Sequence, residues 1–329
     1  MDETNGERTA PASGKGRGKS DMKVRLASGT VYVLILVGFY LLKILVNDFL
    51  FDPLVLAFAM IGTFEMVRAF GEKITLTQRV FVMIFVALVI LTYSISDYVF
   101  REIYHVGIAN GGSNYTPLIT FVVFITGLAI LLGLLVFQHE KVSLESTGYS
   151  LIAYVYPSVF LIVLLGVNHL EWYSDVAILF VFVICPFADS LALVFGKLFG
   201  KKLPAKMAPH VSPNKTLIGG FGGLIGGAVG AVVVFFVYYG LSVPVASGSF
   251  ENVIFEWDEM IFFLGIGVIS ALFSQIGDLV ESAIKRKVGI KDMGKILPGH
   301  GGILDRIDSS LYATLVICLI FTLRIMTVG

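Results

Sequence analysis

Residues 274–308 read SQIGDLVESAIKRKVGIKDMGKILPGHGGILDRID, and a long apolar segment flanks them on each side. Apolar segments of this length are typical of membrane-spanning helices. The stretch between them, called here the charged segment, contains the acids Asp278, Glu281, Asp292, Asp305 and Asp308 and the bases Lys285, Arg286, Lys287, Lys291, Lys295, Arg306 and His300. Charges of both signs packed against a membrane are costly unless they bind something. The charged segment is therefore the candidate active site of a membrane protein.

The first half of the charged segment has the spacing of a helix face. Asp278, Ser282, Lys285 and Arg286 stand at positions i, i+4, i+7 and i+8, which places them on one side of a helix. On such a helix the two basic residues lie about 10–12 Å from the aspartate, and this distance matches the span of a triphosphate. We expect this face to bind phosphate groups.

The second half contains a turn followed by a further pair of acids. Pro298–Gly302 predicts a tight turn, and Asp305 and Asp308 stand three positions apart where the next apolar segment begins. Two helix ends with carboxylates, joined by a basic loop, suit Mg²⁺ that holds a polyphosphate, because Mg²⁺ takes few carboxylates and leaves its other positions to water and phosphate oxygens. From charge alone, a solvated loop on one face of a membrane protein is an equal alternative.

The order of residues in the charged segment resembles a known family. It contains Ser282-x-Ile284-Lys285-Arg286, then Lys291-Asp292-x-Gly294, and then Leu297-Pro298-x-His300-Gly301-Gly302-Ile303-x-Asp305-Arg306-Ile307-Asp308. These runs are similar to the signature of phosphatidate cytidylyltransferases, also called CDP-diacylglycerol synthases. The resemblance implies that CMP is transferred from CTP to phosphatidic acid, which gives CDP-diacylglycerol and pyrophosphate in phospholipid biosynthesis.

Under this hypothesis the polar residues receive specific roles. The catalytic set is Asp278, Asp305, Lys285, Arg286 and Asp308, and the substrate-binding set is Lys291, His300, Arg306, Ser282, Ser212, Lys215, Thr216 and Asp189. The metal is expected to be Mg²⁺ on Asp278 and Asp305, with room for a second cation. Arg286 is expected to hold CTP, and Arg306 the phosphate of the lipid. The lipid is expected to enter sideways between helices.

Composition independently indicates an all-α, polytopic membrane bundle. Of the 329 residues, 56% are hydrophobic and 15% charged, and the mean hydropathy is +0.87, outside the range of soluble proteins. About nine spans are expected, at Leu26–Val46, Pro53–Phe70, Val80–Tyr98, Pro117–Phe137, Tyr149–Val167, Val176–Phe195, Leu217–Leu241, Met260–Leu279 and Ser310–Met326. With 24 basic and 24 acidic residues the formal charge is zero, so nothing suggests nucleic acid as a partner.

The distribution of basic residues predicts the orientation and the domains. If the N-terminus is cytoplasmic, 21 of the 24 lysines and arginines lie on the cytoplasmic side, as the positive-inside rule requires. We expect a disordered basic tail over 1–23, five spans in 24–175, and four catalytic spans in 176–329 with cytoplasmic loops at 196–216 and 280–309. The expected location is the cell membrane of a prokaryote. The expected partners are CTP, phosphatidic acid, the lipid bilayer and a second copy of the chain in a homodimer.

A second informative region runs from Asp189 to Gly230. Asp189 is a carboxylate inside a span, which makes it a functional candidate. Ser212-Pro213-Asn214-Lys215-Thr216 is typical of a helix start and is similar to the Ser-Pro-x-Lys-Thr run of the same family, although Leu193 and Ile218 depart from that family's usual Tyr and Glu. The glycines that follow, spaced four apart, predict close packing of membrane helices rather than a phosphate-binding loop.

Other polar residues receive no catalytic role. Glu65 and Arg68 are expected to pair with each other or to reach the interface. His105, His139, His169 and His210 lie in loops or at span ends. Two alternatives to the synthase remain open: a related enzyme acting on another lipid phosphate, and a transporter of anionic lipids or nucleotides. The transporter is disfavoured because no internal repeat is visible and the charges gather at one face.

Overall fold

The computed structural model describes residues 17–106, 113–247 and 257–328. Among these residues, nine helices are long and apolar enough to cross a membrane, so the predicted all-α membrane bundle is confirmed. They are α1 (Arg17–Leu45), α2 (Asp52–Phe70), α3 (Leu76–Tyr98), α4 (Thr116–Phe137), α5 (Leu144–Asn168), α6 (Ser174–Phe199), α7 (Leu217–Ser247), α8 (Trp257–Val288) and α9 (Leu304–Val328). Short helical turns η1 (Asp48–Phe51), η2 (Gly71–Lys73) and η3 (Val99–Ile103) extend α2 and α3.

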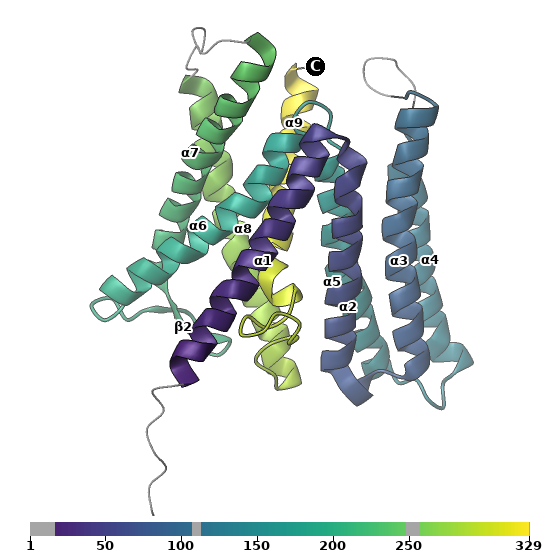
Figure 1. The fold of residues 1–329 in the computed structure, drawn as a ribbon. Coiled ribbons are helices and arrows are strands. Elements are labelled where there is room, and N and C mark those ends of the chain that lie inside the picture. Colours follow the sequence, from purple (N-terminus) through teal and green to yellow (C-terminus); the bar gives the residue numbers. More distant parts are fainter. Residues whose placement is uncertain (1–16, 107–112, 248–256, 329) are drawn as a thin grey trace, which may run out of the picture.

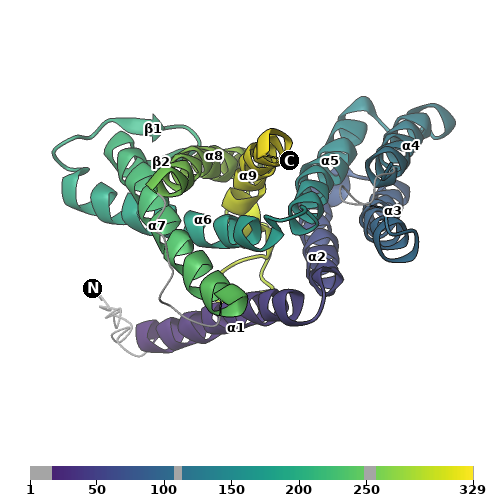
Figure 2. The ribbon, with the colours of Figure 1, turned by 90° about the horizontal axis from the view of Figure 1, so that it is seen from above.

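The helices form two groups that meet along α5 and α9 (Figures 1 and 2). Helices α2–α5 lie on one side and α6–α9 on the other, while α1 crosses in front of α6 and α9. The loops that carry most of the basic residues, including the charged segment, lie at the same end of the bundle as the start of α1 (Figure 1). This end is called here the basic end.

The helices around the charged segment are longer than expected. Helix α8 continues to Val288 and α9 already begins at Leu304, so the expected loop over 280–309 is reduced to residues 289–303. Helix α8 stops where Gly289 adopts φ +79° and Ile290 donates its N–H back to the Lys285 carbonyl at 3.0 Å, a common helix ending. Most of the charged segment is therefore held on rigid helices.

Two other expected boundaries also shift. Helix α1 begins at Arg17, inside the expected tail, and the remainder of that tail, residues 1–16, lies outside the described residues. The expected loop 196–216 contains the end of α6 and an antiparallel hairpin of β1 (Lys206–Ala208) and β2 (Ser212–Thr216). The run Ser212–Thr216 forms a strand, and the span predicted to follow it begins at Leu217, as expected. Thr216 is the residue that caps α7, because its Oγ1 accepts the Gly219 N–H at 3.1 Å.

The glycines of α7 pack this helix tightly against two neighbours. A Cβ on Gly222 would meet Phe195 of α6, and a Cβ on Gly227 would meet Gly267 and Ala271 of α8. The backbones of α6, α7 and α8 therefore approach closely, as small residues permit in membrane helices. This confirms the packing interpretation, and it fixes the hairpin that precedes α7 next to α8.

Candidate active site

The ends of α8 and α9 meet at Lys285. Its Nζ lies 2.5 Å from Glu281 Oε2, one turn earlier on α8, and 2.8 Å from Asp305 Oδ1 on α9. Lys285 and Glu281 are both buried. A lysine between two carboxylates in a buried setting holds the two helix ends together. The structure thus brings together Lys285 and Asp305, as the spacing of the charged segment predicts.

Asp305 also organises the loop between the two helices. Its Oδ2 accepts the backbone N–H groups of Met293 at 2.9 Å and of Gly302 at 2.8 Å. The predicted tight turn lies in this loop, where Gly299 and Gly301 adopt φ +76° and +92°. A carboxylate that accepts several hydrogen bonds is held in one orientation. Asp305 is therefore the point at which loop and helices are joined.

Asp278 receives its partner from the other informative region of the sequence. Lys215 of strand β2 forms an ion pair with Asp278 Oδ2, and Ser282 donates to Asp278 Oδ1 at 3.3 Å. The hairpin before α7 thereby reaches across to α8. The two regions singled out in the sequence form one site.

Three carboxyl groups lie close to one another between α6, α8 and α9, namely those of Asp189, Glu281 and Asp308. The carboxyl groups of Glu281 and Asp308 interact with each other, and those of Asp278 and Asp189 are electrostatic neighbours of Asp308. Glu281 Oε1 is buried and has no hydrogen-bond partner among the described residues. Adjacent buried carboxylates without a donor between them are costly unless a proton or a cation lies there.

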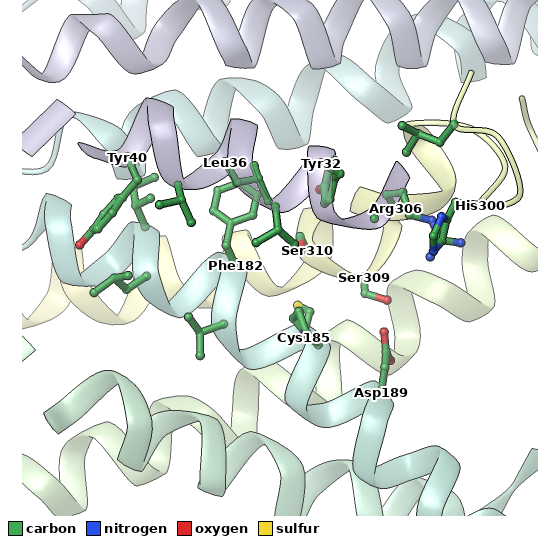
Figure 3. A pocket seen from close by; sticks show the side chains of 18 of the residues that line it. Tyr32, Leu36, Tyr40, Phe182, Cys185, Asp189, His300, Arg306, Ser309 and Ser310 are labelled. Carbon is green, nitrogen blue, oxygen red and sulfur yellow. The ribbon is translucent and has the colours of Figure 1, made fainter. Parts of the chain in front are cut away.

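An apolar cavity of about 440 Å³ opens between α1, α6 and α9. In Figure 3, Tyr32, Leu36 and Tyr40 of α1 face Phe182 and Cys185 of α6 across it. Polar groups gather at the basic end of the same cavity, where Asp189 points toward Ser309 and where Arg306 and His300 lie (Figure 3). The cavity is therefore apolar over most of its length and is lined by charged and polar side chains at the basic end.

A second cavity of about 590 Å³ lies on the loop itself and is lined by polar and basic groups. Its lining includes Arg25, Lys291, Lys295, His300 and Arg306. His300, Arg306 and Leu297 line both cavities. The apolar and the basic cavity therefore share a wall that contains a guanidinium and an imidazole.

The first helix covers this shared wall. Ser28 Oγ lies 2.7 Å from His300 Nδ1 and donates to the Pro298 carbonyl at 2.9 Å, while the Arg25 side chain packs over Gly299. Partial burial, followed by the positive charges of Arg306 and Arg25, lowers the pKa of His300. A lowered pKa favours the neutral imidazole at neutral pH.

Comparison with known proteins places this site in a family. Residues 25–324 match the cytidylyltransferase family. The chain belongs to this family. It is similar to the phosphatidate cytidylyltransferase of Bacillus subtilis (strain 168), with 29% identity over 292 residues that cover 89% of this chain and 94% of the relative.

Two staphylococcal phosphatidate cytidylyltransferases match over shorter stretches. Identity to the Staphylococcus haemolyticus protein is 35% over 56% of this chain and 62% of the relative. Identity to the Staphylococcus aureus (strain COL) protein is 44% over 41% of this chain and 45% of the relative. These two alignments span less than two thirds of the relatives. The family predicted from the motifs is confirmed, and the chain is a member of the cytidylyltransferase family with helices long and apolar enough to cross a membrane.

Not every predicted residue of the cytidylyltransferase faces a cavity. The Arg286 guanidinium donates to the Val211 carbonyl at 3.4 Å and the Ile290 carbonyl at 3.1 Å, so it ties the hairpin to the loop. Of the predicted site residues, Asp189, Lys291, His300 and Arg306 line one or both of the two cavities. The others line neither of the two: Asp278, Ser282, Lys285, Arg286, Asp305, Asp308, Ser212, Lys215 and Thr216. A contact between Arg286 and CTP stays a prediction without support from this geometry.

Two residues at the site were missed in the sequence. Arg25 is the last charge before the first span, and it reaches the basic cavity from α1. For Glu65 the expectation is wrong: it is buried and accepts backbone N–H groups at the start of α9 instead of pairing with Arg68. Arg68 is exposed, in agreement with the expectation that it reaches the interface. A glutamate within an apolar span was the available signal for this role.

Proposed function

We propose that this cytidylyltransferase is a phosphatidate cytidylyltransferase, which converts CTP and phosphatidic acid to CDP-diacylglycerol and pyrophosphate. The observation that carries the proposal is the wall shared by the two cavities, with Arg306 and His300 facing both. An acyl chain fits the apolar cavity, a triphosphate fits the basic one, and the two substrates would meet at the wall. The names of the relatives in Bacillus subtilis and the two staphylococci agree with this assignment.

The reaction requires charge stabilisation more than proton transfer. The nucleophile is a phosphate oxygen of the lipid, already ionised at neutral pH, and it attacks the α-phosphorus of CTP. A new P–O bond forms, the bond to the β-phosphate oxygen breaks, and pyrophosphate leaves with its electron pair. Lys291, Lys295 and Arg25 would hold the triphosphate, and Arg306 the lipid phosphate. Fixed cations in a site of low dielectric stabilise such developing charge.

The carboxylates of the site are of the type that a hard divalent cation takes, and in this structure Lys215 and Lys285 pair with two of them, Asp278 and Asp305. No group of three or more His, Cys, Asp or Glu side chains is placed to hold a metal within the described ranges, but Mg²⁺ needs only one or two carboxylates when substrate phosphates complete its coordination. We propose that Asp278 and Asp305 hold Mg²⁺, and that the unpartnered oxygen of Glu281, beside Asp308, leaves room for a second cation. When bound, Mg²⁺ would neutralise phosphate charge.

The proposed location is the bacterial cell membrane, with the basic end in the cytoplasm. Its support is that 21 of the 24 lysines and arginines fall on the predicted cytoplasmic side, where CTP is available. A cysteine in place of Lys201, in the stretch before the hairpin, should react with a membrane-impermeant reagent only after the cells are opened. Labelling of intact cells would contradict this orientation. A homodimer, with the apolar cavity open sideways to the bilayer, is part of the same proposal.

Incubation of the purified protein with radiolabelled CTP, Mg²⁺ and a set of lipid phosphates tests the function. We expect label to enter lipid with phosphatidic acid, and pyrophosphate to appear in equal amount. Preference for a different lipid phosphate would keep the chemistry and change the substrate. Uptake of labelled nucleotide into sealed vesicles without any labelled lipid would support a transporter instead.

A further inference from the structure

A buried carboxylate from the other half of the bundle reaches into the loop of the site. Glu65 lies on α2 and is 1% exposed. Its Oε1 accepts the N–H of Ile303 at 3.1 Å, and its Oε2 accepts the N–H of Leu304 at 2.9 Å. These residues are 238 and 239 positions away in the chain. The contact therefore joins the two groups of helices at the active site.

The amides that Glu65 binds need an acceptor. Helix α9 begins at Leu304, and the first N–H groups of a helix have no partner within it. A carboxylate at this end also complements the helix dipole. Asp305 binds the preceding amide, that of Gly302, so two carboxylates hold three successive N–H groups immediately before the catalytic residues of α9.

We propose that Glu65 is a positioning residue, which fixes the start of α9 and thereby places Asp305 and Arg306 for CMP transfer. This rests on the proposed function. Glu65 would not touch either substrate. It would act through the backbone of residues 302–304, and so through the direction in which the Asp305 carboxylate and the Arg306 guanidinium point.

The same contact explains why two residues of the family motif are glycine here. A Cβ on Gly302 would lie 2.5–2.6 Å from the Glu65 carboxyl atoms, and a Cβ on Gly294 would also overlap that side chain. Neither glycine adopts a positive φ, unlike Gly299 and Gly301, so backbone conformation does not require glycine at these two positions. The space is taken by Glu65, which is buried and bonded to two amides and so has nowhere to move.

The kinetic test compares Glu65→Gln with Arg68→Gln, an exposed position one turn along α2. The glutamine has the same shape but turns an N–H₂ toward one of the two backbone N–H groups. We expect kcat for CMP transfer to fall about tenfold to a hundredfold at saturating CTP and phosphatidic acid. The KM for CTP should stay close to that of Arg68→Gln. The thermal unfolding temperature should fall, because one buried N–H loses its acceptor, so kcat is compared at a temperature at which both variants are folded. Wild-type kcat in Glu65→Gln would overturn the proposal.

The steric test is a double-mutant cycle that needs no activity. Gly302→Ala alone should lower the thermal unfolding temperature, because its methyl group meets the fixed Glu65 carboxylate. The same substitution in a Glu65→Ala background should lower it much less, because the space is then free. Equal losses in both backgrounds would show that Glu65 does not occupy this space, and would overturn the contact.

The two proposals can fail separately. If the wild-type protein forms no CDP-lipid from any lipid phosphate, the proposed function is wrong, and the unfolding cycle still tests the contact between Glu65 and Gly302. If the wild type is active and Glu65→Gln is equally active, the function stands and the positioning role is wrong.

Discussion

Two clusters of buried charge lie at opposite ends of this bundle, and they differ in which groups adjoin their carboxylates. The cluster far from the charged segment, called here the closed network, joins η1, α2, α3 and α5. His169 lies 2.9 Å from Asp52 and 3.4 Å from Asp97, and Arg101 lies 2.7 Å from Asp97. Asn168 and Asn114 donate to the same two carboxylates at 3.0 and 2.9 Å. His169 adjoins both carboxylates and Arg101 adjoins Asp97 as well, although Asp97 Oδ2 has no hydrogen-bond partner among the described residues.

In the active-site cluster, two carboxyl groups interact directly with each other. Asp278, Asp305 and Glu281 are each paired with a lysine, but the carboxyl groups of Glu281 and Asp308 also adjoin each other, and Glu281 Oε1 has no hydrogen-bond partner among the described residues. Asp189 and Arg306 line a cavity, as Asp97, Arg101 and His169 do in the closed network. The active-site cluster contains the residues of the family motif and the closed network does not, so we expect the charges of the first to bind a ligand and those of the second to stabilise the fold. We therefore expect an Asp→Asn substitution to lower turnover in the active-site cluster and to lower stability in the closed network.

The largest effect is expected at the two carboxylates that we propose as ligands of Mg²⁺. Asp278→Asn and Asp305→Asn should each reduce turnover about a thousandfold or more at any Mg²⁺ concentration, because the amide cannot hold the cation, while the fold persists. Turnover of lipid phosphate and CTP, measured at increasing Mg²⁺ beside the circular dichroism spectrum, checks this. Substantial activity in either variant would remove that residue from the proposed metal site.

In the closed network the same substitution should affect stability rather than catalysis. Asp97→Asn leaves the partly exposed Arg101 without its carboxylate. Breaking a fully buried pair costs about 3–5 kcal/mol, and this pair should cost less because water reaches Arg101. We expect a lower thermal unfolding temperature and an unchanged kcat for the protein that remains folded. Asp175→Asn is the matched control, because Asp175 is about half exposed and its partner Lys43 also binds Asp48. A loss of kcat in Asp97→Asn would mean that the closed network communicates with the site.

The sequence predicted the membrane bundle and the family, because these depend on local apolar length and on a dense motif, and the roles of the site residues stay predictions. Contacts between residues far apart in the chain could not be predicted from local sequence patterns. Glu65 sits near Arg68 in the chain but binds amides 238 and 239 positions away, and Arg25 meets the charged segment only after α1 crosses the bundle. The predicted end of a helix comes too early where charged residues continue that helix, as in α8, because charged residues between apolar segments are typical of loops in membrane proteins.

A smaller effect, on KM, should distinguish the basic residue that binds phosphatidic acid from the one that binds CTP. Arg306 lines both cavities, so Arg306→Ala should raise the KM for phosphatidic acid about tenfold or more, from the loss of a charge-assisted contact. Lys291 lines only the basic cavity of the two, so Lys291→Ala should raise mainly the KM for CTP. Arg286→Ala serves as a comparison, because its guanidinium binds backbone carbonyls instead of facing a cavity. A change in the KM for CTP in Arg286→Ala that exceeds the change in Lys291→Ala would reverse these assignments.

The smallest expected effect concerns the contact between α1 and the site. Burial and the charges of Arg306 and Arg25 lower the pKa of His300 in the folded protein, while the unfolded chain keeps a value of about 6.5. Between the lowered value and 6.5 the unfolded state binds the extra proton, so the stability contributed by neutral His300 is present above 6.5 and is lost as the pH falls. The thermal unfolding temperature of the wild type should therefore drop more between pH 8 and pH 5.5 than that of His300→Gln, which cannot titrate there. Equal drops would show that protonation of His300 does not weaken the contact with Ser28 and Arg25, and that α1 is held at this end by the remaining contacts alone.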